Sequence, residues 1–226
     1  MSVTEGLRVR GIVVVCPEGE PTLPEIDDVE MVRVPSRPGK ADIDPLLGEH
    51  DRLVVAGTDA DLAAVALRLL RKEQLPGVSL GFVPSSPDSD VARIWSLPTQ
   101  PLRALALALR GEVDPVPLIR DDNGGVLVGR GVIGMIRGVA YCDEHTVLRG
   151  PARSIEVEPD ASGPGLMVRV TKGTLFKRPT TQYARAFQLG CIPTRPSSDG
   201  VAHPRAMSRW TWYRHTEDLR LVRGLV

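Results

Sequence analysis

Acidic side chains gather at two places where the sequence predicts that a strand ends and a helix begins. Asp59 and Asp61 follow the apolar run 51–57, and Asp88 follows the run 76–84. Carboxylates at such junctions have two uses: they bind a divalent cation, or they accept hydrogen bonds from the free amides of a helix N-terminus. The residue types favour the helix cap for Asp59 and Asp61, because short acceptors suit the amides of a first turn.

The elements that must position these junctions alternate between strand and helix. Strands are expected over 11–16, 29–35, 51–57 and 76–84, and helices over 62–72, directly after 85–90, and over 101–111. Alternation of this kind predicts a parallel sheet covered by helices on both faces. Ligands of such sheets bind at the carboxyl ends of the strands, which is where both acidic junctions lie.

A different pattern starts at Glu112, where the helical period disappears. Asn123 and Gly124 predict a hairpin, since this pair tolerates the positive φ angles of tight turns. Further strands are expected over 154–159, 166–173, 184–192, 207–215 and 218–224. The sequence therefore predicts an N-terminal Rossmann-like three-layer α/β domain over 1–111, followed by an antiparallel β-sandwich domain over 112–226.

The composition is that of a globular chain: 226 residues, 42% hydrophobic, with 28 basic and 28 acidic side chains. No run approaches the roughly 18 apolar residues of a spanning helix, the start is a poor signal peptide, and three cysteines are too few for a disulfide framework. We therefore expect a cytoplasmic protein. Residues 1–150 are net acidic and 151–226 net basic, which indicates two modules or a basic surface that meets phosphate, anionic lipid or nucleic acid.

Both junctions resemble motifs of the diacylglycerol kinase catalytic-domain family of lipid kinases, which shares its architecture with NAD kinases and phosphofructokinases. The family motif Gly-Gly-Asp-Gly-Thr-Leu corresponds to Gly-Thr-Asp-Ala-Asp-Leu at 57–62. The motif Leu-Gly-x-x-Pro-x-Gly-Thr-x-Asn-Asp-x-Ala-Arg corresponds to 80–93, with Leu, Gly, Pro, Asp, Ala and Arg in register. Near the end of the chain, Asp-Gly-Val at 199–201 corresponds to the family's Asp-Gly-Glu.

The resemblance implies ATP-dependent phosphorylation of a lipid hydroxyl, with ATP and Mg²⁺ bound in a cleft between the two domains. Residues of both junctions would then bind the nucleotide: Gly57, Thr58, Asp59, Ser85, Ser86 and Asp88. The resemblance also implies a catalytic role for Asp199, and if the chain is active, Asp59 and Asp61 are expected to bind the metal ion.

Several substitutions remove what a phosphate site needs. Glycine-rich turns let phosphates reach backbone amides, because no Cβ intervenes and a positive φ costs little. Here Thr58 and Ala60 replace two glycines of the first motif, and Ser-Pro-Asp-Ser at 86–89 replaces Gly-Thr-x-Asn. Pro87 has no amide hydrogen, and Val201 stands where the family has a candidate general base. The sequence predicts weak or absent kinase activity, that is, a pseudoenzyme with a degenerate ATP site that keeps its cleft for a lipid, a small molecule or a protein partner.

One alternative is an active ATP- and Mg²⁺-dependent lipid kinase. In this case Asp59, Asp61 and Asp88 hold the cation that separates their carboxylates from the phosphates, and Asp199 assists.

A second alternative is a non-enzymatic module whose basic β face binds nucleic acid, anionic lipid or an acidic protein. The stretch 205–223 interleaves arginines with Trp210, Trp212 and Tyr213, as single-stranded nucleic-acid binders and peripheral membrane faces do. Strand alternation is the simpler interpretation, with tryptophans in the core and arginines in water.

Two other motifs match a function only formally. Residues 129–134 read Gly-Arg-Gly-Val-Ile-Gly, the dinucleotide fingerprint, but no helix is expected after them. Cys142, Asp143, Glu144 and His145 are adjacent residues that point in different directions, and no second ligand cluster has zinc-like spacing. A solvated loop is expected there.

Overall fold

The computed structural model describes residues 11–17, 23, 29–173 and 179–224. Four parallel strands form the first sheet, in the order β2-β1-β3-β4: β1 (Ile12–Pro17), β2 (Glu30–Val34), β3 (Arg52–Gly57) and β4 (Ser79–Pro84). Nearly every residue of β1, β3 and β4 is buried, because helices cover both faces of the sheet. All four strands expected from the sequence are confirmed.

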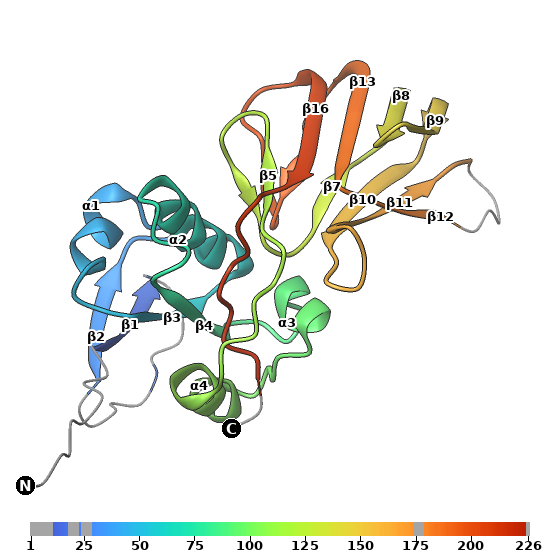
Figure 1. Ribbon diagram of the computed structural model, residues 1–226. Helices are drawn as coiled ribbons and strands as arrows, with labels where there is room; N and C mark the ends of the chain where they lie inside the picture. The colour runs from blue at the N-terminus through green and yellow to red at the C-terminus, as the bar shows by residue number, and fades with distance from the viewer. Residues whose placement is uncertain (1–10, 18–22, 24–28, 174–178, 225–226) are drawn as a thin grey trace, which may run out of the picture.

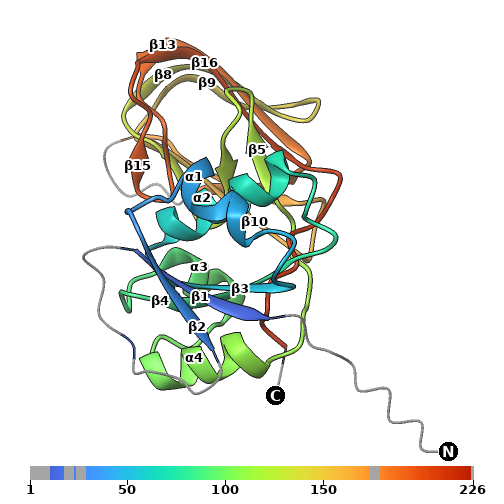
Figure 2. The same cartoon turned by 90° about the vertical axis from the view of Figure 1, so that its left-hand side faces the viewer.

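Helices and sheet form three layers (Figure 2). The helical elements are α1 (Lys40–Ile43), the single 3₁₀ turn η1 (Asp44–Leu46), α2 (Asp59–Arg71), α3 (Asp90–Trp95) and α4 (Pro101–Arg110). α1 and α2 lie on one face of the sheet and α4 on the other. Gly81 on β4 permits the close approach of α4, since a Cβ there would lie 2.7 Å from the carbonyl oxygen of Ala108.

Helix α2 begins at Asp59, three residues before the expected start at Leu62. The expected turn before the helix is in fact its first turn, because Thr58 is the N-cap: the Thr58 hydroxyl accepts a hydrogen bond from the Asp61 amide. The single-turn helix α1 is not predicted by the sequence pattern.

The second domain is a sandwich of two six-stranded antiparallel sheets (Figure 1). One sheet, in the order β12-β11-β10-β7-β14-β15, contains β7 (Gly131–Ile133), β10 (Ser154–Pro159), β11 (Leu166–Thr171), β12 (Thr180–Ala184), β14 (Ser197–Ser198) and β15 (Val201–Ala202). The other, in the order β6-β5-β16-β13-β8-β9, contains β5 (Ile119–Asp121), β6 (Val126–Leu127), β8 (Ile136–Cys142), β9 (His145–Ala152), β13 (Ala186–Thr194) and β16 (Met207–Arg214). The α/β plus β-sandwich architecture expected from the sequence is therefore present.

Strand β16 decides between the two interpretations of the arginine- and aromatic-rich stretch. Trp210 and Trp212 are buried between the sheets, and the rings of Trp212 and Phe187 lie 6.0 Å apart. Arg209, which precedes Trp210 and lies on the opposite face of the strand, is exposed. The half-buried strand is confirmed, and the two tryptophan rings are not free to stack on nucleic-acid bases.

The last described segment returns to the first domain instead of forming the strand expected over 218–224. It makes isolated bridges only, and the amide of Leu80 on β4 donates to the Arg220 carbonyl at 2.8 Å. Leu219 and Leu221 belong to the core cluster of the α/β domain, together with Val116. Residues beyond the expected boundary at 111 thus help to build the core of the first domain.

The remaining motifs are structural. Asn123 and Gly124 lie in the hairpin between β5 and β6, and residues 131–133 of the formal dinucleotide fingerprint form β7. Asp143 turns the β8–β9 hairpin and accepts hydrogen bonds from the amides of Arg185 and Ala186. None of the helices in the described ranges has the length and apolar character that crossing a membrane requires.

Candidate functional site

A polar cavity of about 210 Å³ lies where the carboxyl ends of β3 and β4 face the sandwich. It is lined by Gly57, Thr58, Asp59, Ser85, Ser86, Asp88, Ser89, Asp90, Asp199 and Gly200. The structure therefore brings together all six residues of the expected nucleotide site and Asp199, which comes from the turn between β14 and β15. Asp61, the other expected metal ligand, does not line this cavity.

Asp59 joins the two junctions. Its carboxylate accepts hydrogen bonds from the Ser89 hydroxyl at 2.5 Å and from the amides of Asp90 at 2.8 Å and Val91 at 3.3 Å. Burial raises the pKa of Asp59, and these hydrogen bonds oppose the shift. Both oxygens of Asp59 thus hold the start of α3 against the start of α2.

Asp61 holds helix α2 to the loop that follows β2. Its buried carboxylate accepts hydrogen bonds from the Thr58 amide at 2.9 Å, the Thr58 hydroxyl at 2.7 Å and the Arg37 amide at 2.7 Å. Thr58 and Asp61 form a capping box, in which each residue satisfies a donor of the other. This is the helix cap that the residue types favour, and it leaves Asp61 outside the cavity.

The second junction satisfies its own amides. Ser86 accepts hydrogen bonds from the amides of Asp88 at 3.1 Å and Ser89 at 3.3 Å, and the Ser89 hydroxyl accepts one from Ala92 at 3.0 Å. Together with the two amides that donate to Asp59, every N–H over residues 88–92 has an acceptor within the chain. A phosphate at this turn would have to displace bonds that the fold already makes.

The cavity is acidic. Asp59, Asp88, Asp90 and Asp199 line it, and within the described part of the chain no lysine, arginine or histidine does so. Asp90 is the one that forms salt bridges, with Arg93 at 2.7 Å and Arg130 at 3.1 Å. These two guanidinium groups neutralise Asp90, and neither arginine lines the cavity. The other carboxylates keep the cavity acidic, whereas a polyphosphate site carries positive charge.

Asp199 is held by a tight turn. Asp199 and Gly200 have φ angles of +50° and +80°, the left-handed conformation that an Asp-Gly pair favours in a two-residue hairpin. The carboxylate accepts hydrogen bonds from the amides of Val128 at 3.1 Å and Gly129 at 2.7 Å. Burial raises the pKa of Asp199 to about 8, and neighbouring carboxylates of the cavity add to the shift. Asp199 therefore carries a proton at neutral pH.

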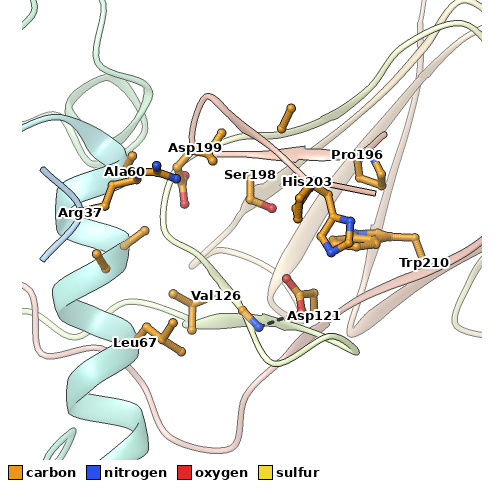
Figure 3. A pocket seen from close by; sticks show the side chains of 16 residues that line it. Arg37, Ala60, Leu67, Asp121, Val126, Pro196, Ser198, Asp199, His203 and Trp210 are labelled. Carbon is orange, nitrogen blue, oxygen red and sulfur yellow. Dashed lines mark hydrogen bonds between the residues drawn. The ribbon is translucent and has the colours of Figure 1, made fainter. Parts of the chain in front are cut away.

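A mostly apolar cavity of about 240 Å³ lies beside the polar one and shares Asp199 with it (Figure 3). One wall is helix α2, with Ala60 and Leu67. The opposite wall is the sandwich, where the rings of His203 and Trp210 meet edge to face with centroids 5.3 Å apart. We call the two cavities together the inter-domain cleft; it has an acidic end and an apolar end.

Sequence reasoning missed several residues in or next to this cleft. Gly129 lies between two carboxylates, because a Cβ on it would be 3.0 Å from an oxygen of Asp199 and 3.4 Å from one of Asp59. Its only signal was the formal dinucleotide fingerprint, which points to another function. His203 and Trp210 carry no signal for the cleft, since only the packing of the sandwich on α2 places them there.

Most of the carboxylates expected to hold Mg²⁺ are used by the fold. Over the part of the chain that the structure describes, no cluster of three or more Asp, Glu, His or Cys side chains is arranged to hold a metal ion. The oxygens of Asp59 and Asp61 already accept hydrogen bonds at two helix starts. Asp88 is exposed and is alone among the expected metal ligands in having no such bond to its carboxylate.

Replacing Asp59 with alanine is expected to lower the free energy of unfolding by about 2 kcal/mol. The substitution removes the acceptor for the Ser89 hydroxyl and for two amides at the start of α3, and water in the cavity replaces part of what is lost. Asp88→Ala is the matched control in the same cavity, with an expected change within about 0.5 kcal/mol. Urea unfolding measures both, and equal effects would mean that Asp59 does not join the junctions.

Comparison with solved structures identifies the fold. A crystal structure of a diacylglycerol kinase from Bacillus anthracis str. Sterne superposes with a TM-score of 0.76 and 11% sequence identity, over 97% of this chain and 98% of that one. An NAD kinase from Archaeoglobus fulgidus in complex with ATP superposes with a TM-score of 0.61 and 12% identity, over 94% of both chains. The chain has the fold of these kinases, and identities this low show the fold alone.

Comparisons of sequence add no function. Human intercellular adhesion molecule 5 aligns at 26% identity over 178 residues, which is 75% of this chain and 18% of that protein. The chain thus spans less than a fifth of the curated relative that it matches. No family model matches the sequence.

Proposed function

We propose that this chain, which has the fold of the diacylglycerol kinases, is a divergent member of that group that has lost ATP binding and keeps its inter-domain cleft for another ligand. The hydrogen bonding of the second junction carries this proposal, because every amide over 88–92 donates within the chain. A phosphate-binding turn needs amides that are free to donate.

Electrostatics acts in the same direction. A carboxylate about 5 Å from a phosphate charge opposes binding by about 3 kcal/mol at an effective dielectric constant of about 20. Repulsion by one such carboxylate lowers the affinity for nucleotide by roughly a hundredfold. Asp59 and Asp88 both line the cavity, and over the described ranges no basic side chain lines it to compensate.

Base catalysis also lacks a suitable group. Val201, which borders the apolar end of the cleft, has no proton acceptor where the family has an acid. Both oxygens of Asp199 already accept hydrogen bonds, from the amides of Val128 and Gly129, so this carboxyl serves the turn rather than an acceptor hydroxyl. Under this proposal the chain neither binds nucleotide nor activates an acceptor hydroxyl.

The polarity of the cleft favours a small amphiphile that is uncharged or cationic. Its apolar part would lie among Leu67, Val126 and Trp210, and its hydroxyl or amine would face Asp88 and Asp199. A protonated carboxyl at Asp199 can donate a hydrogen bond to such a group. Apolar walls with a few polar groups at one end are usual for sites that bind small molecules.

Phosphoryl transfer tests the loss of kinase activity. Purified chain is incubated with γ-labelled ATP, Mg²⁺ and dioctanoylglycerol in mixed micelles, with Asp88→Ala as the paired variant. No labelled lipid is expected from either protein. Labelled lipid that disappears in Asp88→Ala would establish the active, metal-dependent kinase instead.

Titration with octylamine tests the retained cleft separately. Trp210 lines the apolar end, so a ligand there is expected to change its fluorescence in a saturable manner. Trp210→Phe identifies the source of the signal, since Trp95 and Trp212 remain. An unchanged spectrum of the wild-type chain would count against a cationic amphiphile as the ligand.

A further inference from the structure

A larger cavity, of about 750 Å³, opens in the β-sandwich, and none of its described lining residues belongs to the inter-domain cleft. It lies where the chain crosses between the two sheets. Met135 is in the crossing from β7 to β8, and Arg153 is in the crossing from β9 to β10. Pro193 and Thr194 end β13, just before the crossing to β14. The cavity is therefore a mouth between the two layers of the sandwich.

The lining of this mouth is mainly apolar. It contains Met135, Ile136, Pro151, Ala152, Ile192 and Pro193. Met135 is 87% exposed and Ile192 63% exposed, which places two large apolar side chains in water at one opening. Scattered exposed apolar residues are ordinary, but two that line one cavity favour a ligand that covers them.

Two arginines give the mouth its charge. Arg137 and Arg153 line it, both are exposed, and neither guanidinium group forms a salt bridge or hydrogen bond within the described ranges. Among the residues that the structure describes, no aspartate or glutamate lines the mouth. Elsewhere in the same sandwich Arg169 is paired, with Glu156 at 3.3 Å. The mouth thus combines apolar walls with two cations that no carboxylate of the lining neutralises.

We infer that this mouth binds a single-chain amphiphile whose head group is a carboxylate or phosphate. The hydrocarbon chain covers Met135 and Ile192, and Arg137 and Arg153 hold the head group through charge-assisted hydrogen bonds. The volume falls within the range of about 300–1,000 Å³ that is usual for sites of small ligands. This site is opposite in charge to the inter-domain cleft and does not depend on the function proposed for that cleft.

Calorimetric titration of the full chain with three ten-carbon probes tests this inference. Decanoate is expected to bind, whereas decanol and decyltrimethylammonium are expected to bind at least about tenfold more weakly, because neither accepts the arginine hydrogen bonds as an anion. Equal affinities for decanoate and decyltrimethylammonium would overturn the assignment of the arginines, and no binding of decanoate would overturn the site.

Variants locate the binding. The double variant Arg137→Glu and Arg153→Glu is expected to raise the Kd for decanoate by about tenfold or more. Arg149→Glu with Arg209→Glu is the matched control, since both arginines are exposed residues of the same sandwich and line no part of the mouth. If the control variant lost the same affinity for decanoate, the change in net charge alone would explain the effect, and the site would be refuted.

The apolar half of the site is tested by Ile192→Glu. Ile192 is largely exposed, so the substitution is expected to leave the fold unchanged while it places a carboxylate in the mouth and weakens decanoate binding about tenfold. Undiminished affinity in this variant would contradict the placement of the hydrocarbon chain.

Vesicles of phosphatidylglycerol distinguish a single bound ligand from a membrane surface. If the chain bound these vesicles but not decanoate, the mouth would contact a membrane surface, and the proposal would be overturned.

Discussion

Asp61→Ala is expected to lower the free energy of unfolding by about 4 kcal/mol, the largest effect of any acidic substitution near the cleft. The Asp61 carboxylate accepts hydrogen bonds from the amides of Arg37 and Thr58 and from the Thr58 hydroxyl, and it is fully buried. Without it, buried donors are left without acceptors, and each costs about 1–3 kcal/mol. Urea unfolding of the two proteins measures the difference.

Asp42→Ala is the matched control for Asp61→Ala. Asp42 occupies the same third position of its helix and accepts a hydrogen bond from the Gly39 amide at 2.8 Å, but in an exposed setting. Its loss is expected to cost about 0.5 kcal/mol. If Asp61→Ala lowered the free energy of unfolding no more than Asp42→Ala does, the buried cap would add no extra stability. A cation site at Asp61 would then regain support.

The stability of the chain is expected to fall as pH rises through the neutral range, because of Asp199. The pKa of Asp199 is about 8 in the folded chain, against an ordinary value of 3.8. Between these values the folded chain holds a proton that the unfolded chain has released, so stability is lost as pH rises and levels off above about pH 8. One such group changes the unfolding free energy by about 1.4 kcal/mol per pH unit, or about 3 kcal/mol from about pH 5.5 to about pH 7.5.

Asp199→Asn isolates this contribution. Asparagine tolerates the left-handed conformation of the turn and does not titrate, so the variant is expected to show a shallower fall of stability with pH. Asp143→Asn is the control, since Asp143 also has a φ of +50° in a hairpin turn but is exposed. An unchanged slope in Asp199→Asn, or an equal change in both variants, would refute the buried, protonated carboxyl.

The fold of the first domain could be predicted because its signals are local. Runs of valine and leucine ended by Gly57 or Pro84 mark strands, and the capping box at Thr58 and Asp61 marks the start of α2. That start was still misplaced by three residues, since the acidic turn was not recognised as a first helical turn. The return of Leu219–Leu221 to the core of this domain has no local signal, because its partners lie more than a hundred residues earlier.

The candidate site could be predicted in part. Residues at the ends of β3 and β4 meet because parallel neighbouring strands end at the same edge of a sheet. Asp199 joined them only through the family resemblance, since its contact with Gly129 spans 70 residues of chain. The residue types favoured helix caps for both Asp59 and Asp61, but they could not separate the surroundings of the two: one lines the cavity and the other is buried against the loop at Arg37.

A common physical cause connects the proposed loss of function to the stability of the fold. The amides that a phosphate would use at the second junction are the ones that fix the start of α3. Serine and aspartate side chains now supply from within the chain the acceptors that a bound phosphate would otherwise provide. The hydrogen bonds that we propose exclude nucleotide therefore also stabilise the folded chain.

Calorimetric titration of the purified chain with ATP in the presence of excess Mg²⁺ tests the central claim most directly. With the amides over 88–92 occupied and the carboxylates of Asp59 and Asp88 lining the cavity, no saturable heat of binding is expected up to millimolar ATP. Saturable binding at micromolar ATP that weakens in Asp88→Ala would contradict the account, because it would mean that the acidic cavity still holds a nucleotide through a metal ion.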